Sequence, residues 1–322
     1  MTAKRLRLFD PDGLNSRVRK DDRRRPLLAV AADPSEQIRL GADGSGLVPG
    51  SSDGLPVRLV KPHSAKKAKM VGSDLGTVGR AMNRKWFPVN YLELFCGPGY
   101  LYNEATGEEL PGSPLQALGL AAPFDRYVFS DSSQTCTDAL AARIASLRAQ
   151  QPTLPPTEVR CGDANDSQHL DRVCSLLNPR ALVIAYLDPA KPNLHFATVR
   201  YLAARFKFID LIINLPFSGI HRSLAAGGED GPRLMLNHDH PRELLHREEG
   251  RTAENIRNHY DEQLGGLGFA HIARRCVKTT ATNSPLYDVV LASRNAVGVK
   301  LFERANPPLK SQQLGILDLD AG

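Results

Sequence analysis

The chain has 322 residues, of which 42% are hydrophobic and 24% charged, and its net charge is +6. This composition is typical of a folded globular protein, and no run approaches the roughly 18 apolar residues that a membrane-spanning helix needs. The beginning of the sequence is charged and the five cysteines show no C-x-x-C spacing, so we expect a cytoplasmic protein with no disulfide framework and no metal site.

Residues 1–57 are predicted to form a disordered basic arm and linker. Residues 4–25 hold nine Lys or Arg and four Asp, which is +5 of the net charge. Such an arm can bind nucleic acid through its phosphates, although a solvated arm without a partner has the same composition. Glycine and serine then dominate up to residue 54, as in a linker. A helix over residues 66–82 is predicted from apolar residues at spacings of three and four.

Residues 58–305 are predicted to form a doubly wound, Rossmann-like α/β domain, because strand-like and helix-like segments alternate there. The expected parallel strands cover residues 90–95, 126–130, 158–161, 181–187 and 209–214. The expected helices cover residues 137–149, 167–177, 196–206 and 252–264, with a shorter one that Ser113 caps. A late antiparallel hairpin is expected at 271–279 and 285–293, an irregular insert at 218–252, and a tail at 306–322.

Four of the expected parallel strands end at a carboxylate. These residues are Glu93, Asp131, Asp163 and Asp188. The carboxyl ends of parallel strands meet at one edge of a sheet, where ligands bind. A row of acids needs donors or cations to receive it. S-adenosylmethionine (AdoMet) offers an ammonium, ribose hydroxyls, an adenine amine and a sulfonium. Acids also cap loops and helices, but four in register favour a bound ligand.

The first strand runs into a glycine turn, Gly97-Pro98-Gly99. Glycines without Cβ atoms let a ligand approach the backbone. Tyr102 occupies the third glycine position of the G-x-G-x-x-G fingerprint, which disfavours a dinucleotide. An acidic strand end before G-x-G resembles motif I of the class I AdoMet-dependent methyltransferases. That resemblance implies a set of cofactor-binding residues, with Asp131 at the ribose and Asp163 at the adenine edge: Glu93, Phe95, Gly97, Gly99, Asp131, Asp163 and Ala164.

Three residues are candidates for catalysis. Asp188-Pro189 occupies the place of the catalytic motif of amino-methylating enzymes, Asp/Asn-Pro-Pro-Tyr/Phe, but Ala190-Lys191 follows and the aromatic residue is missing. Asn214-Leu215-Pro216-Phe217 matches the letters better, yet it lies one strand later and also fits an ordinary turn with Phe217 in the core. We therefore favour Asp188, followed by Asn214, and consider Lys191 as a cation that faces the substrate.

A more specific resemblance follows from segments in the same order along residues 62–305. Residues 92–99 and Leu110-Pro111-Gly112-Ser113-Pro114 resemble the signature of three-Cys-motif partner proteins, the TcmP family, with Glu93 in place of the usual Asp and Cys96 in place of the usual Ala. Residues 124–129, 161–165, 187–189, 213–216 and 286–293 continue the resemblance. It implies a methyltransferase-like fold and a three-Cys-motif protein as a partner.

Three functions remain open at this point. The first is an AdoMet-dependent methyltransferase that acts on nucleic acid, favoured by the basic arm and the amino-methylase motif. The second is an AdoMet-binding or non-catalytic partner of a three-Cys-motif protein, favoured by the missing aromatic residue. The third is a methyltransferase that acts on a small molecule or a protein, favoured by the nearly neutral body of the chain.

Overall fold

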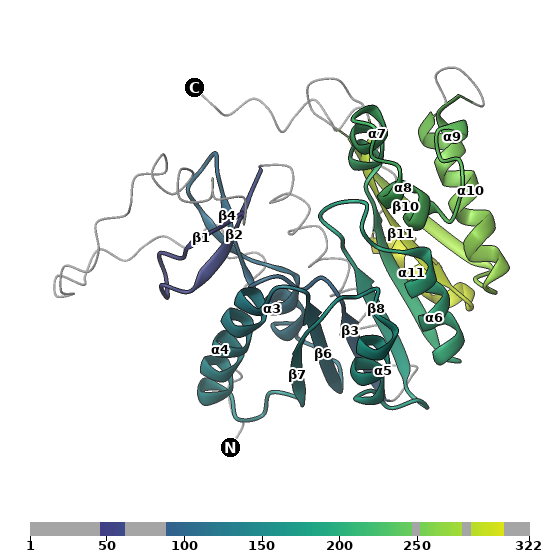
Figure 1. Cartoon of the computed structure of the whole chain (residues 1–322). Coiled ribbons are helices and arrows are strands. Elements are labelled where there is room, and N and C mark those ends of the chain that lie inside the picture. Colours follow the sequence, from purple (N-terminus) through teal and green to yellow (C-terminus); the bar gives the residue numbers. More distant parts are fainter. Residues whose placement is uncertain (1–45, 62–87, 247–251, 279–284, 306–322) are drawn as a thin grey trace.

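A computed structural model of the chain describes residues 46–61, 88–246, 252–278 and 285–305. The basic residues 4–25, the helix expected over 66–82 and the tail 306–322 lie outside these ranges. The described residues form a large seven-stranded sheet with helices on both faces and a small four-stranded sheet beside it (Figure 1).

The large sheet has the strand order β10-β11-β9-β8-β3-β6-β7. Its strands are β3 (Val89–Glu93), β6 (Arg126–Asp131), β7 (Thr157–Cys161), β8 (Leu182–Leu187), β9 (Ile209–Leu215), β10 (His271–Lys278) and β11 (Pro285–Ser293). Neighbouring strands from β9 to β7 pair in parallel, whereas β11 is antiparallel to both β9 and β10. The predicted fold class, a mostly parallel doubly wound sheet with a late hairpin, is confirmed.

Strand β3 is the switch point of the sheet. The chain continues from β3 to β6 and β7 on one side, and then crosses to β8 on the other side. In open α/β sheets the ligand crevice lies at such a point, outside the carboxyl ends of the strands. The glycine turn follows β3 directly, so the topology brings this turn to the place where a ligand binds.

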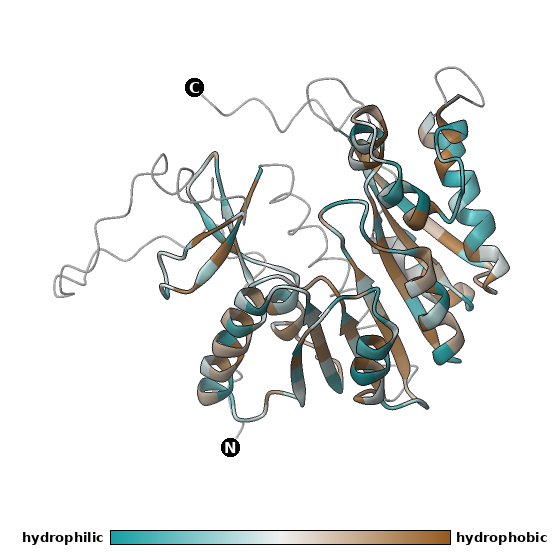
Figure 2. Ribbon diagram, viewed as in Figure 1, coloured by the Kyte–Doolittle hydropathy of each residue, from teal (hydrophilic) through white to brown (hydrophobic). Residues whose placement is uncertain are grey.

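Two hydrophobic cores lie on the two faces of the large sheet, whose strands are largely hydrophobic (brown in Figure 2). Helices α5 (Ser167–Ser175), α6 (Phe196–Arg205) and α10 (Thr252–Gly266) pack on one face through residues such as Val173, Leu202 and Tyr260. Helices α3 (Ser113–Leu118), α4 (Gln134–Gln150) and α11 (Ala296–Ala305) lie on the other, where Leu115 and Leu140 meet the strands. Helix α11 was not predicted.

The small sheet was not predicted either. Its strands are β1 (Leu47–Pro49), β2 (Pro56–Val60), β4 (Tyr100–Asn103) and β5 (Glu109–Pro111), in the order β1-β2-β4-β5. Residues 47–57 are therefore structured, which corrects the linker prediction for this stretch. Strands of three to five residues carry too little alternation to be recognised, and the core that they share consists of Val48, Val57 and Tyr102.

The expected irregular insert at 218–252 contains three short helices, which corrects that prediction. They are α7 (Phe217–Ala225), α8 (Asp230–Leu236) and α9 (Glu243–His246). Helix α7 buries Ile220 and Leu224 in the core. Gly227 at φ +83° follows α7, and Asn237 at φ +50° ends α8. These breaks make each helix too short for its apolar period to be recognised in the sequence.

Candidate cofactor-binding site

The glycine turn is held by the end of strand β6. The Asp131 Oδ2 accepts a hydrogen bond from the Gly97 N–H at 2.9 Å, and its Oδ1 accepts one from the Ser133 N–H at 2.9 Å. One carboxylate thus joins the loops that follow β3 and β6. Each of its oxygens still has a lone pair for a ligand donor such as a hydroxyl.

The two glycines of the turn have different surroundings. Both have positive φ angles, +62° at Gly97 and +100° at Gly99, which favour glycine. A Cβ on Gly97 would have no atom of the described residues within 4 Å, so this side of the backbone is open to them. A Cβ on Gly99 would lie 3.1 Å from Leu140 of α4. Gly97 therefore fits the predicted close approach of a ligand, whereas Gly99 lacks a Cβ because α4 packs against it.

Glu93 lies inside the protein rather than at its surface. Its side chain is completely buried, with Oε1 accepting from Ser113 Oγ at 2.5 Å and Oε2 from the Tyr91 hydroxyl at 3.1 Å. Burial raises the pKa of Glu93 to about 8, and the charges of Asp188 and Asp131 act in the same direction. Ser113 does not cap α3 as predicted, because Gly112 occupies the cap position and the serine hydroxyl turns to Glu93.

The loop after β7 places the third acidic residue at the surface. The Asp163 Oδ1 accepts from the Asn165 backbone N–H at 2.9 Å, and Ala164 is buried beside it. Asn165, which the sequence reasoning missed, accepts from the His195 N–H at 2.8 Å and donates to the Asn193 carbonyl at 2.9 Å. The loops after β7 and β8 are therefore joined at the same edge of the sheet.

A buried histidine beneath this loop was also missed. His169 of α5 lies 2.7 Å from the Ser130 hydroxyl through its Nε2. A Cβ on Gly162 would approach the His169 ring to 2.2 Å, so only glycine fits there. Desolvation lowers the pKa of His169, which disfavours the charged form of the ring. In the sequence, Gly162, next to the expected acidic residue Asp163, is the feature that could have indicated this packing.

The candidate catalytic residues Asp188 and Asn214 lie side by side, at the ends of the neighbouring strands β8 and β9. The preceding residues, Leu187 of β8 and Ile213 of β9, are paired in register. The Asp188 Oδ2 accepts from the Tyr186 hydroxyl at 2.9 Å. Asn214 is 4% exposed, and its Oδ1 has no hydrogen-bond partner among the residues that the structure describes.

Two other residues that were considered for stacking or for catalysis differ in their exposure. Phe217 is 5% exposed and belongs to the core, with the Arg257 guanidinium 5.0 Å from its ring centre. It is therefore not available to stack on a substrate. Lys191 is exposed in the loop between β8 and α6.

These residues fit AdoMet in their chemistry. Acceptors at Asp131 and Asp163 suit hydroxyl and amine donors, and the open side of Gly97 leaves room beside the backbone. Phe95 is half-buried at the turn. The structure has one cavity of about 290 Å³ next to His195 and Arg233 and another of about 360 Å³ next to Asp210 and Arg294. Neither lining includes the glycine turn, so the candidate site is not one of these two cavities.

Two general features complete the description. Among the described residues, no group of three or more His, Cys, Asp and Glu side chains is arranged to hold a metal ion. In the same part of the chain, no helix is both long enough and apolar enough to cross a membrane.

Known structures similar to this one include methyltransferases. A Legionella pneumophila protein of family DUF519 is 12% identical, with a TM-score of 0.46 over 74% of this chain and 92% of that one. An O-methyltransferase from Bacillus cereus in complex with SAH is 14% identical, with a TM-score of 0.43 over 81% and 90%. The methyltransferase domain of a bacterial protein, CtHen1-C, is 13% identical, with a TM-score of 0.39 over 70% and 100%. No family model and no curated protein matches the sequence.

Proposed function

We propose that this protein binds AdoMet at the carboxyl edge of its large sheet and transfers the methyl group to an acceptor. The observation that carries the proposal is the turn at Gly97, which has an open side and is held by Asp131 at the switch point of the sheet. Asp131 would bind the ribose hydroxyls, and Asp163 with Ala164 the adenine. Glu93 would support the turn from inside, and Phe95 would border the cofactor.

The acceptor side of the site is assigned to Asp188 and Asn214. AdoMet, when bound, supplies an electrophilic methyl group on a sulfonium. Asp188 is held by Tyr186 at the end of β8, next to the switch point, and it can accept a hydrogen bond or a proton from the acceptor group. The unpartnered Asn214 Oδ1 can accept a second hydrogen bond beside it. A pair of acceptors suits a group with two N–H bonds, such as the exocyclic amine of a nucleobase.

Nucleic acid is therefore the acceptor class that we propose first, with residues 4–25 as the segment that contacts phosphates and Lys191 as a further cation near the site. The second function is an AdoMet-binding partner of a three-Cys-motif protein without turnover. The aromatic residue absent after Pro189 and the burial of Phe217 favour it, since neither segment then offers a ring to stack on a base.

Calorimetry with AdoMet and S-adenosylhomocysteine tests the cofactor site. We expect micromolar affinity for both, and a loss of about 1.5–3 kcal/mol in binding free energy in Asp131→Ala, the scale of hydrogen bonds to a charged group. Asp163→Ala should also weaken binding. Unchanged affinity in both variants would disprove the site assignment.

Transfer of labelled methyl groups to pools of RNA, DNA, protein and small molecules tests turnover. Asp188→Ala should lower the rate about 10²–10⁴-fold, the usual contribution of a positioned acid or base, while AdoMet affinity changes little. Asn214→Ala should have a smaller effect. If the wild type binds AdoMet but methylates nothing in any pool, the non-catalytic partner is the correct function.

A further inference from the structure

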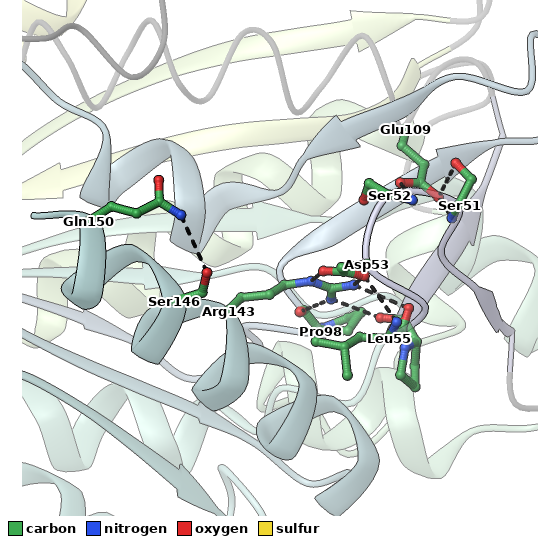
Figure 3. A network of polar contacts seen from close by, with 10 residues as sticks. Ser51, Ser52, Asp53, Leu55, Pro98, Glu109, Arg143, Ser146 and Gln150 are labelled. Carbon is green, nitrogen blue, oxygen red and sulfur yellow. Dashed lines mark hydrogen bonds and ion pairs between the residues drawn. The ribbon is translucent and has the colours of Figure 1, made fainter. Parts of the chain in front are cut away.

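A single buried arginine connects the glycine turn to the small sheet. Arg143 of α4 is 5% exposed, and its side chain donates hydrogen bonds to two segments of the chain, residues 53–56 and Pro98 (Figure 3). Its Nε and Nη2 bind the two Asp53 oxygens at 2.8 and 2.9 Å. Its Nη1 binds the carbonyls of Pro56 at 2.8 Å and of Pro98 at 2.6 Å. Arg143 also lies 5.0 Å from the centre of the Tyr100 ring.

The partners of Arg143 lie far apart in the sequence but belong to one structural unit. Asp53 is in the turn between β1 and β2, and Tyr100 begins β4 of the same sheet. Pro98 lies between the two glycines of the turn, and this turn leads directly into β4. A second contact, from Ser51 Oγ to Glu109 of β5 at 2.9 Å, holds the Asp53 turn against the sheet. The small sheet and the glycine turn therefore meet at this guanidinium.

The glycine turn needs constraints from outside itself. Gly97 and Gly99 have no side chains and can adopt many backbone conformations. Three hydrogen bonds from other segments hold the turn. The Asp131 carboxylate accepts from the Gly97 N–H, the Gly112 N–H donates to the Gly99 carbonyl at 2.7 Å, and Arg143 donates to the Pro98 carbonyl. The bond from Gly112 continues the pairing of β4 with β5, whereas the bond from Arg143 depends on Asp53 in the turn between β1 and β2.

The ion pair with Asp53 keeps Arg143 in place. A buried guanidinium is stable only when it is paired and hydrogen-bonded, and Asp53 is its sole carboxylate partner among the described residues. If Asp53 lost its charge, the buried arginine would lose its counterion and gain by turning toward water. The hydrogen bond to Pro98 would then be lost together with the ion pair.

We propose that Arg143, held by Asp53, is a positioning residue that sets the conformation of the glycine turn for AdoMet. The small sheet is thus a part of the cofactor site, although no residue of β1 or β2 belongs to a recognised motif. This inference rests on the proposed function, because the affinity that it concerns is that for AdoMet.

The test compares AdoMet affinity with stability in three variants. Asp53→Asn keeps the size of the side chain and removes only the charge, and Arg143→Met removes the whole guanidinium. Arg294→Met is the matched control. Arg294 also donates hydrogen bonds to several carbonyls, those of Ala203, Phe206, Lys207 and Leu267, and lies 5.1 Å from the centre of the Phe269 ring, yet it has no contact with the turn.

Calorimetry with AdoMet, performed well below the melting temperature of each variant, gives the dissociation constants. We expect an increase of about threefold to thirtyfold in Asp53→Asn and Arg143→Met, the range of couplings carried through a network of contacts. The double variant should match Arg143→Met alone, since both changes break the same connection. Arg294→Met should lower the melting temperature without changing the affinity.

Amide hydrogen exchange of the peptide that spans residues 94–101 gives a second measurement without ligand. Exchange should be faster in Asp53→Asn and Arg143→Met and unchanged in Arg294→Met. Equal affinity and equal exchange in wild type, Asp53→Asn and Arg143→Met would overturn the inference while leaving the proposed function intact. If the wild type does not bind AdoMet, both the proposed function and the positioning role of Arg143 are wrong.

Discussion

Glu93 is a carboxyl group that the fold keeps away from water. Its pKa is about 8, well above the usual value, because burial disfavours the charged form. In the unfolded chain the group releases its proton near pH 4.5. Between these two pH values the folded protein binds one more proton than the unfolded chain, so this group makes stability fall as pH rises. Its contribution is complete below about pH 4.5 and is lost as the pH approaches 8.

We predict that Glu93→Gln removes this pH dependence. Glutamine mimics the protonated acid and can keep hydrogen bonds to Ser113 and Tyr91. The difference in unfolding free energy between variant and wild type should grow from pH 5 to pH 8, with a slope of up to about 1.4 kcal/mol per pH unit. Urea unfolding at several pH values measures it. A difference that does not change with pH would show that Glu93 is ionised in the folded protein.

The open side of Gly97 allows a prediction that separates binding from stability. In Gly97→Ala the new methyl group meets no atom in the described part of the chain, so stability should fall by only about 1–2 kcal/mol, the cost of the left-handed conformation. AdoMet binding should be lost, since the methyl group occupies the place of the ligand. In Gly99→Ala the methyl group meets Leu140, and stability should fall further. Calorimetry measures the AdoMet affinity of both variants, and thermal unfolding measures their stability. Tight AdoMet binding by Gly97→Ala would contradict the proposed site.

The positions of the acidic residues at the strand ends could be predicted, but their partners could not. Asp131, Asp163 and Asp188 lie at or just after the ends of the expected parallel strands, and a parallel sheet brings these ends to one edge. The bond of Glu93 to Ser113 spans 20 residues and the pair of Arg143 with Asp53 spans 90. No local pattern reports such distant pairs, because they depend on how the elements pack.

At the scale of elements, an ion pair joins α10 to the hairpin strand β11. Asp288 is completely buried and binds Arg257 through two bonds, of 2.7 Å and 2.9 Å. We predict that Arg257→Met lowers the unfolding free energy by about 3–5 kcal/mol, because it leaves a buried carboxylate without its main partner. Denaturant unfolding measures the loss. Asp288→Leu combined with Arg257→Met should recover part of it, and an equal loss in both variants would show that packing by the Arg257 side chain is the main contribution.

The long elements were predicted well and the short ones were not. Strand β8 and helix α6 carry enough apolar residues to show their period, and their predicted bounds differ from the structure by one residue at one end. Strands β1 and β5 have three residues each, which is too short for a repeated alternation of faces to be recognised. Their pairing with β2 and β4 stabilises them, and a sequence window cannot contain that information.

At the scale of the whole molecule, the N-terminal residues that carry the charge are not the ones that belong to the small sheet. The basic residues 4–25 carry most of the net charge, whereas residues 47–60 belong to the small sheet and hold Arg143 through Asp53. Two deletions separate these contributions. We predict that deletion of residues 1–45 weakens binding to single-stranded RNA and reduces its dependence on salt, because phosphate contacts release counterions. AdoMet affinity and the melting temperature should stay near those of the wild type.

Deletion of residues 1–60 should give a different result, because it also removes β1, β2 and the counterion of a buried arginine. We expect the unfolding free energy to fall by a further 3 kcal/mol or more, roughly the cost of an unpaired buried charge, together with a weaker affinity for AdoMet. Thermal unfolding, calorimetry and RNA binding at two salt concentrations measure the three quantities on both proteins. If both deletions unfold at the same temperature and bind AdoMet equally, the small sheet is not a part of the cofactor site. If RNA binding is unchanged in the shorter deletion, the nucleic-acid contacts lie within the folded body, whose charge is nearly neutral.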